Sequence, residues 1–306
     1  MHNHIKSQQQ SDTPQRGVTT KAPQGRQNLT VGETHGQTHL QTKFEKLKTI
    51  ISHHKKLAIA YSSGVDSTFL LRVAHDMLKD HTIAITARAN WFSKRELDES
   101  KAFCEQMQIR QIIVDISADE IEGFNPNPPN RCYLCKRVLF GKIKEIATQL
   151  GMTTVAEGSN LDDLSDYRPG MQAIAELGIQ SPLREAGLTK NEIRELSHQL
   201  GLETWDKPSF ACLASRFVYG ESITPQKLQM VEQAEQFLMS LGFRQIRVRI
   251  HGMMARIEVL PEAFDQIIAK RDNINKALKS PGFSYITLDL LGYRTGSMNE
   301  LLIKLC

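Results

Sequence analysis

From about residue 42 onward, the apolar positions of the chain alternate between two spacings. Phe44, Leu47, Ile50 and Ile51 recur at the spacing of one helical face. A continuous apolar run follows, which is typical of a short buried strand. The alternation then continues, with strands predicted at 57–61, 82–87, 111–116 and 153–156 and a helix after each of the first three. Strands that alternate with helices indicate a parallel sheet covered by helices on both faces.

Local signals also predict where several helices begin and end. Ser93 with Glu96, and Thr189 with Glu192, have the spacing of a capping box. A helix expected from about residue 132 to 150 ends at Gly151, a residue that often terminates helices. The helix after the first strand has five apolar side chains on its predicted inner face: Phe69, Leu70, Val73, Ala74 and Met77.

The pattern changes after an aperiodic segment at 206–220. Thr224 and Pro225 predict the start of a long helix that ends at Gly242. Alternating strands are expected beyond it, at 244–250, 255–260 and 285–290, with a helix after Pro261. The sequence therefore predicts an α/β domain over 42–215 and a smaller C-terminal α+β domain over 216–306.

Residues 1–41 carry almost no aliphatic pattern and are rich in Gln, Thr and His, so we expect a disordered tail. They hold four Lys or Arg and two Asp or Glu. Of the formal net charge of +4, only +2 therefore belongs to the rest of the chain. That charge is too small to indicate a nucleic-acid partner.

Composition also bears on the compartment. No run of 18 apolar residues predicts a membrane span, and the N-terminal residues lack the apolar segment of a secretory signal. The five cysteines are odd in number and lack the spacing of a disulfide framework, which favours free thiols in a reducing compartment. We therefore expect a cytoplasmic protein, in which Cys104 and Cys306 have structural roles.

The strongest chemical signal is the segment that joins the first strand to its helix: Ser62, Ser63, Gly64, Val65, Asp66 and Ser67. A helix N-terminus offers unpaired N–H groups and a positive dipole end, which favour an anion. Gly64 allows close approach of the backbone to a phosphate, and the serines offer hydroxyl donors. Asp66 would repel a bare phosphate, so its presence indicates a bridging Mg²⁺. The segment resembles the SGGxDS loop of the PP-loop ATP pyrophosphatases, with Ser63 where that superfamily usually has Gly.

Three cysteines are candidates for chemistry. Cys132 and Cys135 open a helix, where they can grip a metal or cluster and where the helix N-terminus lowers thiol pKa values. Alone, the pair is compatible with half of a zinc site, a redox pair or chance. Cys212 lies in an aperiodic loop between Lys207 and Arg216, a cationic setting that favours thiolate. A buried apolar role for Cys212 is the alternative.

The order of several motifs is more specific. The phosphate loop, CYLCK, EGSNLDDLSDYRPG (157–170), SPL, KPSFACLASR and GYRTGSMNE together resemble the LarE family, the ATP-dependent sulfur transferases of nickel-pincer cofactor synthesis. The resemblance covers nearly everything from residue 43 to the end. It implies that ATP adenylates a carboxylate of pyridinium-3,5-biscarboxylic acid mononucleotide, with release of pyrophosphate, and that sulfur then replaces the activated oxygen.

The resemblance also implies how sulfur is carried. Some members sacrifice the cysteine that matches Cys212, while others hold a [4Fe-4S] cluster through cysteines that match Cys132, Cys135 and Cys212. Because all three are present, we favour the cluster type, in which three thiolates leave one iron open for a hydrosulfide. Family members form hexamers, so a homo-oligomer is expected.

Arg247 and Arg249 share one face of a predicted strand. Two neighbouring guanidiniums suit a phosphate, and an ordinary solvated face is the alternative. The family resemblance supports them, with Arg294, as contacts for the substrate. The remaining residues expected near the substrate or the adenylation site are Lys136, Asp163, Ser215, Arg216, Glu235 and Asp265. Trp91 and Trp205 are expected to serve packing.

Several other functions fit parts of the pattern. An ammonia-using synthetase of the same superfamily would need no cysteine trio. A nucleotide-binding regulator with a structural metal site would bind ATP without releasing pyrophosphate. A tRNA thiolase also joins such a loop to cysteines, but the low net charge and the absence of a recognisable RNA-binding module disfavour it.

Overall fold

The structure is a computed structural model that describes residues 31–165 and 169–299. Its first sheet has the strand order β3-β2-β1-β4, and every neighbouring pair is parallel. The strands are β1 (Leu57–Ala60), β2 (Thr82–Arg88), β3 (Gln111–Asp115) and β4 (Thr154–Ala156). This is the predicted parallel sheet, and the predicted strand bounds agree with it to within about two residues.

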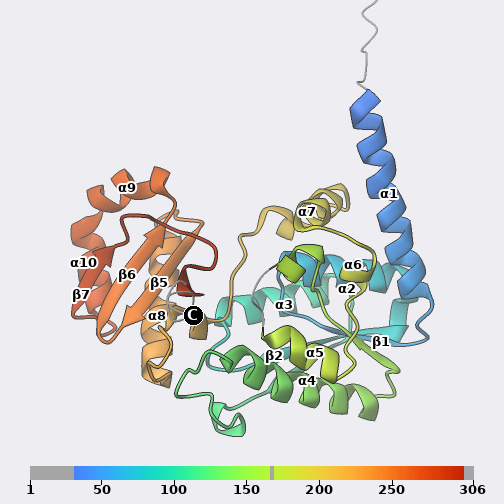
Figure 1. Ribbon diagram of the computed structural model, residues 1–306, viewed down its shortest axis with the longest axis horizontal. Helices are drawn as coiled ribbons and strands as arrows, with labels where there is room; N and C mark the ends of the chain where they lie inside the picture. The colour runs from blue at the N-terminus through green and yellow to red at the C-terminus, as the bar shows by residue number, and fades with distance from the viewer. Residues whose placement is uncertain (1–30, 166–168, 300–306) are drawn as a thin grey trace, which may run out of the picture. The chain divides into compact units, whose positions relative to one another are not determined.

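Helices cover both faces of this sheet, as the sequence predicted (Figure 1). Alternate side chains of β1 explain why: Leu57 and Ile59 pack into one buried cluster with α2, whereas Ala58 packs into another with α4. The helices of this part are α1 (Val31–Ser52), α2 (Val65–Leu78), α3 (Lys94–Gln106), α4 (Arg131–Gln149), α5 (Gly170–Glu176), α6 (Pro182–Glu185) and α7 (Lys190–Gln199).

The second sheet is small and mixed, with the order β5-β6-β7. Strands β5 (Ile246–His251) and β6 (Met254–Val259) are antiparallel, and β7 (Tyr285–Leu288) pairs with β6 in parallel. Its helices are α8 (Pro225–Ser240), α9 (Phe264–Ala269) and α10 (Arg271–Lys279). This is the predicted α+β unit, and residues Leu40–Cys306 form one compact unit. The domain boundary near residue 215 stays a prediction.

The connection between the sheets is part of the core. Leu213 and Phe217 belong to the same buried cluster as α4 on one side and β5 and β6 on the other. Short 3-10 helices shape this connection, at Glu203–Asp206 and Leu213–Arg216. The aperiodic segment of the sequence is therefore held in place by both sheets, and it carries Cys212.

Some local predictions hold and others do not. Thr189 and Glu192 form the predicted capping box of α7. Ser93, in contrast, makes no side-chain cap, and the first-turn N–H of Lys94 instead donates to the Glu232 carboxylate of α8 at 2.8 Å. Met77, which the apolar spacing predicts on the inner face of α2, is 41% exposed near the helix end.

The first helix begins earlier than expected. Helix α1 starts at Val31, whereas the sequence predicts a disordered tail up to residue 41. Extending a formed helix costs less than nucleating one, so the amphipathic segment beyond residue 42 can support further turns before it. Residues 1–30, residues 166–168 of the EGSN motif and Cys306 lie outside the described part of the chain.

Across the described ranges, none of the helices combines the length and the apolar character that crossing a membrane requires.

Candidate active site

The predicted phosphate loop joins the end of β1 to the first turn of α2. Gly64 is the N-cap of α2, and the Thr68 N–H donates to the Gly64 carbonyl at 2.9 Å. The Ser67 hydroxyl lies 3.1 Å from the Ser62 hydroxyl and accepts from the Ser62 N–H at 3.3 Å. Val65 is buried beneath the loop. The loop therefore presents a helix N-terminus with two hydroxyls beside it, an arrangement that favours an anion.

Ser63 has a different position in this loop. Its φ of 54° lies in the left-handed region, which explains why a glycine suits the position. Its buried hydroxyl donates to the Glu96 carbonyl of α3 at 2.9 Å, and Lys207 Nζ donates to the Ser63 carbonyl at 2.8 Å. The Ser63 side chain thus ties the loop to α3, while Lys207 ties it to the segment before Cys212.

Asp66 lies in the first turn of α2 and is held by two side chains from other segments. Lys190 Nζ lies 2.5 Å from Asp66 Oδ2, and Asn160 Nδ2 donates to Asp66 Oδ1 at 3.4 Å. Lys190 opens α7. The carboxylate that the sequence predicts as a Mg²⁺ ligand therefore lies next to a lysine, whose positive charge suits a phosphate.

The EGSN motif packs directly on this first turn. A Cβ at Gly158 would lie 2.9 Å from the Ser67 nitrogen, so only glycine fits there. Glu157 is buried and accepts hydrogen bonds from the Ser159 N–H at 3.0 Å and from the Ser159 and Ser181 hydroxyls at 2.8 and 2.5 Å. Asp163, a predicted site residue, accepts from the Asn160 N–H at 3.0 Å. The motif therefore fixes Asn160 beside Asp66.

The cysteine pair lies at the first turn of α4, beside a buried arginine. Arg131 is 1% exposed and donates to the Ala214 carbonyl at 2.9 Å and to the Asn127 amide oxygen. Its second terminal nitrogen lies 3.9 Å from Cys132 Sγ. Because Ala214 is two residues beyond Cys212, Arg131 joins the cysteine pair to the Cys212 loop.

All three candidate cysteines come together in the fold. Cys135 interacts electrostatically with both Cys132 and Cys212, and both cysteine segments pack on the same buried cluster. A chain of contacts connects the phosphate loop to the Cys212 loop. Ser63 binds the main chain of Glu96, the Glu96 carboxylate interacts with Arg216, and Arg216 donates to the Cys212 carbonyl at 3.3 Å.

The protonation of the thiols differs from the sequence prediction. Burial, reinforced by the neighbouring cysteines, raises the pKa of Cys135 to about 12. Burial also raises the pKa of Cys212, although Arg131 and Arg216 act in the opposite direction. The expected lowering of these pKa values by a helix N-terminus and by nearby cations is therefore wrong for both, because desolvation outweighs it. Both thiols are protonated at neutral pH in the absence of a bound cation.

The geometry also bears on metal binding. Across residues 31–165 and 169–299, no group of three His, Cys, Asp or Glu side chains is drawn together closely enough to hold one metal ion. A cluster differs from a single ion, because its cysteines bind separate iron atoms and so lie farther apart.

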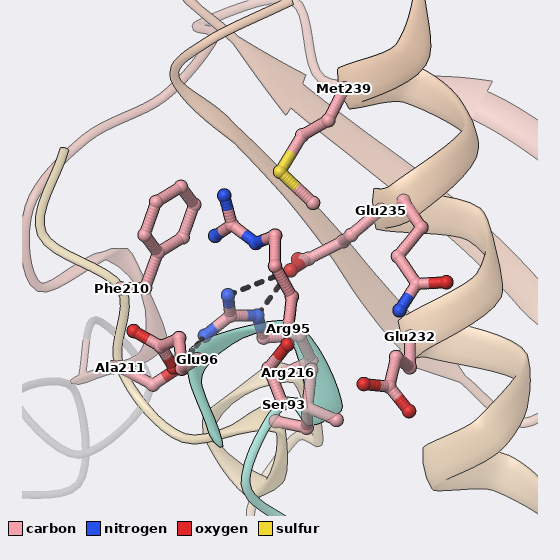
Figure 2. Close-up of a pocket in the computed structure, with 11 residues that line it drawn as sticks. Ser93, Arg95, Glu96, Phe210, Ala211, Arg216, Glu232, Glu235 and Met239 are labelled. Atoms are coloured by element: carbon pink, nitrogen blue, oxygen red, sulfur yellow. Dashed lines mark hydrogen bonds and ion pairs between the residues drawn. The ribbon is translucent and has the colours of Figure 1, made fainter. Parts of the chain in front are cut away.

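A pocket beside the Cys212 loop is dominated by one buried ion pair. Figure 2 shows the Arg216 guanidinium facing the Glu235 carboxylate, with Phe210, Ala211 and Glu96 around it. Two parallel hydrogen bonds of 2.8 Å join Arg216 and Glu235. Burial alone would raise the pKa of Glu235, yet Arg216 lowers it below its ordinary value. Glu96, whose charge is less well compensated, has its pKa raised by burial.

The two strand arginines, Arg247 and Arg249, are both buried, at 4% and 7% exposure. Arg249 binds the Glu258 carboxylate through two bonds of 3.1 and 3.0 Å and the Ser215 carbonyl at 2.7 Å. The Arg247 guanidinium lies against the Phe210 ring, 5.6 Å from its centroid, and burial beside Arg216 lowers its pKa to about 10. Neither arginine lies on a solvated face.

The remaining predicted residues are more scattered. The Ser215 hydroxyl accepts from Arg216 at 2.8 Å, within the Cys212 loop. Lys136 lies one turn along α4 from Cys132 and passes beside Gly170, where a Cβ would meet its side chain at 2.6 Å. Arg294 donates to Asp289 at 3.4 Å, and Asp265 is exposed on α9.

Several residues of the site were missed by the sequence reasoning. Those that bind the predicted residues directly are Gly158, Asn160, Lys190, Arg131, Lys207 and Glu258. Gly158, Asn160 and Lys207 lie within the EGSN and KPSFACLASR motifs, so the family resemblance could have identified them. Lys190 and Glu258 lie in ordinary helical and strand patterns, and only the fold brings them to Asp66 and Arg249.

The strand, phosphate loop and helix, set in a parallel sheet, define the chain as a PP-loop ATP pyrophosphatase. A more distant relative supports this class. It is one of the subunits of the glutamine-hydrolysing GMP synthase from Thermococcus kodakarensis, and it is 25% identical over 215 residues, which cover 65% of this chain and 68% of the relative. No protein-family model matches the chain.

Closer relatives define the family. The pyridinium-3,5-bisthiocarboxylic acid mononucleotide synthase of Lactiplantibacillus plantarum is 37% identical over 270 residues, which cover 87% of this chain and 96% of the relative. An uncharacterised protein of Synechocystis sp. is 42% identical over 267 residues, which cover 87% of this chain and all of the relative. The chain belongs to the LarE family of pyridinium-3,5-bisthiocarboxylic acid mononucleotide synthases.

Proposed function

We propose that the protein is an ATP-dependent sulfur transferase that converts a carboxylate of pyridinium-3,5-biscarboxylic acid mononucleotide to a thiocarboxylate, in nickel-pincer cofactor synthesis. One observation carries the proposal beyond the family relationship. The phosphate loop and the Cys212 loop are joined through Ser63, Glu96 and Arg216, so an activated carboxylate and a sulfur source can share one site.

The first half of the reaction uses the phosphate loop. A substrate carboxylate oxygen attacks the α-phosphorus of ATP, and the bond to the β-phosphate bridge breaks to release pyrophosphate. The N-terminus of α2 and the hydroxyls of Ser62 and Ser67 bind the phosphates, and Lys190 adds a positive charge. Asp66 is the carboxylate through which a Mg²⁺ would be held, since Mg²⁺ in such sites uses one or two carboxylates together with phosphate oxygens.

The second half delivers sulfur to the acyl carbon, and AMP leaves with the activated oxygen. We assign Cys132, Cys135 and Cys212 as ligands of a [4Fe-4S] cluster. The donor set fits, because three interacting thiols lie beside two buried guanidiniums that offset the charge of thiolates. When bound, such a cluster supplies an iron without a protein ligand, suited to carrying a hydrosulfide. Loading requires the thiols to lose their protons, as metal binding generally does.

A sacrificial cysteine is the other way to supply sulfur. In that case Cys212 takes the acyl group as a thioester, its Cβ–Sγ bond breaks with loss of the α-proton, and dehydroalanine remains in the chain. The two routes differ in which variants retain activity. The cluster route predicts that Cys132→Ala, Cys135→Ala and Cys212→Ala each lose iron and multiple turnover. Retained single turnover in the first two, with dehydroalanine at 212, would exclude it.

The arginines of β5 are assigned to the substrate. We expect Arg247→Ala and Arg249→Ala to weaken binding of the pyridinium mononucleotide more than binding of ATP, because both lie on the C-terminal sheet next to the Cys212 loop. The ion pair with Glu258 holds the Arg249 guanidinium in one position, which favours a well-defined contact with the substrate. Titrating each ligand separately tests this assignment, and equal losses for the two ligands would contradict it.

The overall reaction is tested with the full chain under anaerobic conditions. The purified protein receives ATP, Mg²⁺ and the pyridinium mononucleotide, after reconstitution with iron and sulfide. We expect pyrophosphate and AMP only when the mononucleotide is present, and a product whose mass reflects exchange of oxygen for sulfur. Formation of an amide with added ammonia would instead indicate a synthetase, and ATP binding without pyrophosphate release would indicate a regulator.

We also propose a cytoplasmic location and a homo-oligomeric state for the protein. Thiols that must bind iron and sulfide need a reducing compartment, which supports the location. No nucleic-acid partner is expected. Fractionation of the source cells and light scattering of the purified protein test these two assignments.

A further inference from the structure

Lys207 opens the segment that carries Cys212, yet its side chain reaches the phosphate loop. Its Nζ donates to the Ser63 carbonyl at 2.8 Å and to the Ser63 hydroxyl at 3.4 Å. The same nitrogen donates to Glu99 of α3 at 2.6 Å, and the side chain is only 12% exposed. One ammonium therefore joins the phosphate loop, α3 and the Cys212 segment, and the reaction proposed above gives it no role.

Neutralising nearby carboxylates does not explain why Lys207 is buried. The Glu99 side chain is 40% exposed, so a lysine at the surface could pair with it while staying hydrated. Glu96 lies 3.9 Å from Nζ, beyond hydrogen-bond distance. Burying an ammonium costs desolvation energy, which specific hydrogen bonds must offset. The inward hydrogen bond that Lys207 gains is the one to the Ser63 carbonyl.

The Ser63 carbonyl belongs to the peptide that leads into α2. The carbonyl and the N–H of a trans peptide point in opposite directions, so a carbonyl held by Lys207 directs the Gly64 N–H away from Lys207. In the described part of the chain, this N–H donates to no protein acceptor. The Ser62 and Ser67 hydroxyls flank Gly64, since a Cβ built there would lie 3.6 and 4.0 Å from them. The N–H is thus one of the free donors that a helix N-terminus offers to an anion.

The backbone conformation of Ser63 makes this peptide depend on contacts from outside the loop. Its φ of 54° is left-handed, a conformation that a serine adopts only at a cost. The Ser63 hydroxyl is held at the Glu96 carbonyl, and the Ser63 carbonyl is held by Lys207. Lys207 is itself anchored, because Arg194 of α7 donates to its carbonyl at 2.7 Å. A fixed group from another segment therefore sets the direction of the Gly64 N–H.

We propose that Lys207 is a positioning residue for adenylation: by holding the Ser63 carbonyl, it directs the Gly64 N–H toward the phosphates of bound ATP. The inference rests on the proposed function only in placing ATP at the phosphate loop. Lys207 lies five positions before Cys212, so the segment that carries the sulfur chemistry also orders the loop that activates the carboxylate. A substitution in that segment should then impair ATP binding although no cysteine is changed.

Binding of MgATP to the full chain gives the first test. Lys207→Met removes the ammonium and keeps the apolar stem, whereas Lys207→Arg keeps a charged donor. We expect calorimetric titration to show MgATP affinity weaker by about 10- to 100-fold in Lys207→Met, the range that one hydrogen bond to a charged group accounts for. Lys207→Arg should restore part of the affinity.

Arg194→Met is the matched control. It removes the hydrogen bonds to the carbonyls of Trp205 and Lys207, and so loosens the same segment without touching the phosphate loop. We expect its MgATP affinity to stay near the wild-type value. Equal losses in Arg194→Met and Lys207→Met would show that Lys207 only anchors the segment, and would overturn the positioning role.

A spectroscopic signature reports on the peptide itself. Ser63 and Gly64 form the only Ser-Gly pair in the sequence, so cell-free synthesis with carbonyl-¹³C serine and ¹⁵N glycine labels both sides of that one peptide bond. A carbonyl–amide correlation spectrum then contains a single signal. We expect Lys207→Met to move the Ser63 carbonyl signal upfield, as loss of a hydrogen bond does, and to reduce the change in the Gly64 amide signal when MgATP is added. Arg194→Met should leave both unchanged.

The outcomes separate this inference from the proposed function. If the wild-type protein does not bind MgATP, the assignment of the phosphate loop fails, and this inference fails with it. If wild type and Lys207→Met bind MgATP equally well, the positioning role fails while the sulfur transferase stands. Weaker binding with an unchanged Ser63 signal in the free protein would mean that Lys207 contacts the nucleotide itself, which also overturns the positioning role. Lys207→Gln, whose side chain is one bond shorter, replaces Lys207→Met if that variant does not fold, with the same expected results.

Discussion

The phosphate loop and the three-cysteine region are built in different ways. The turn of the loop is formed by hydrogen bonds between residues within five positions of one another, such as Ser62 with Ser67 and Thr68 with Gly64. Longer contacts, from Glu96, Asn160, Lys190 and Lys207, then hold the loop in the fold. The cysteine region instead depends on contacts across eighty or more positions even to bring its cysteines together, such as Arg131 with Ala214. The turn itself is a property of a strand and a helix N-terminus, whereas the cysteine region exists only in the folded protein.

The difference extends to charge. The loop attracts anions through main-chain N–H groups that need no partner of opposite charge. The cysteine region contains buried guanidiniums, and Arg216 is neutralised by Glu235. Removing one member of a buried pair leaves the other without compensation. We therefore expect substitutions in the phosphate loop to reduce activity but to leave the fold intact. Substitutions of the buried charges in the cysteine region should instead lower the free energy of unfolding.

The largest effect is expected at the buried pair. Arg216→Met should lower the free energy of unfolding by about 3–5 kcal/mol, because Glu235 stays buried without its partner. The same change also frees the carbonyls of Ala211 and Cys212. Urea unfolding measures the loss. The double variant Arg216→Met with Glu235→Leu should recover part of it, and a single variant as stable as wild type would contradict the comparison.

Asp66→Asn tests whether a substitution in the phosphate loop removes activity without lowering stability. We expect pyrophosphate release to fall by about 100-fold or more, since a metal-bridged phosphate loses several kcal/mol of stabilisation when its carboxylate ligand is neutralised. The urea midpoint should change little, because Asp66 and its ion-pair partner Lys190 are both only partly buried and such pairs contribute little to stability. Turnover at the wild-type rate with Mg²⁺ and ATP would remove Asp66 from the reaction.

Gly158→Ala examines the contact between the EGSN motif and α2. The new Cβ would meet main-chain atoms at 2.9 and 3.2 Å, which cannot move independently, so we expect a loss of about 1–3 kcal/mol and weaker ATP binding. Gly141→Ala is the matched control. It lies inside α4 with open space around it, and alanine should stabilise the helix by about 0.5–1 kcal/mol. Similar effects of the two changes would contradict the contact.

Acidification should weaken the ion pair between Arg216 and Glu235. The pKa of Glu235 is lowered in the folded protein, so its contribution is present above its ordinary pKa of 4.5 and is lost as the pH falls through the folded value. Unfolding midpoints measured from pH 6 to pH 3 should therefore decrease. The Arg216→Met, Glu235→Leu variant should show a shallower decrease, and an identical slope would assign the acid sensitivity elsewhere.

The smallest effect is expected at Ser63. Glycine removes a left-handed strain of about 1–2 kcal/mol but also the hydroxyl that binds the Glu96 carbonyl, which contributes about 0.5–1.5 kcal/mol. Ser63→Gly should therefore change stability by less than about 1 kcal/mol. Ser63→Ala keeps the strain and loses the bond, so it should be less stable than Ser63→Gly by thermal unfolding. Because both variants lack the hydroxyl, the reverse order would show that the left-handed backbone at this position carries no strain that glycine relieves.

Much of the fold could be predicted from the sequence because the signals are local. Apolar spacing predicted the four parallel strands and the change to a smaller α+β unit, and Thr189 with Glu192 predicted the start of α7. Ser93 shows the limit of such signals. It has the same spacing to Glu96, yet its helix is capped by Glu232 from a helix more than a hundred positions away.

The sequence by itself determined the order of elements, the phosphate loop and the family, because each depends on residues that are close together in the chain or on ordered motifs. Only the tertiary structure decided the electrostatics of the site. Burial reversed the expected direction of the pKa values of Cys135 and Cys212, and the fold paired Lys190 with Asp66 and Glu258 with Arg249. Desolvation and long-range pairing depend on what surrounds a group in space, which its neighbours in the chain do not specify.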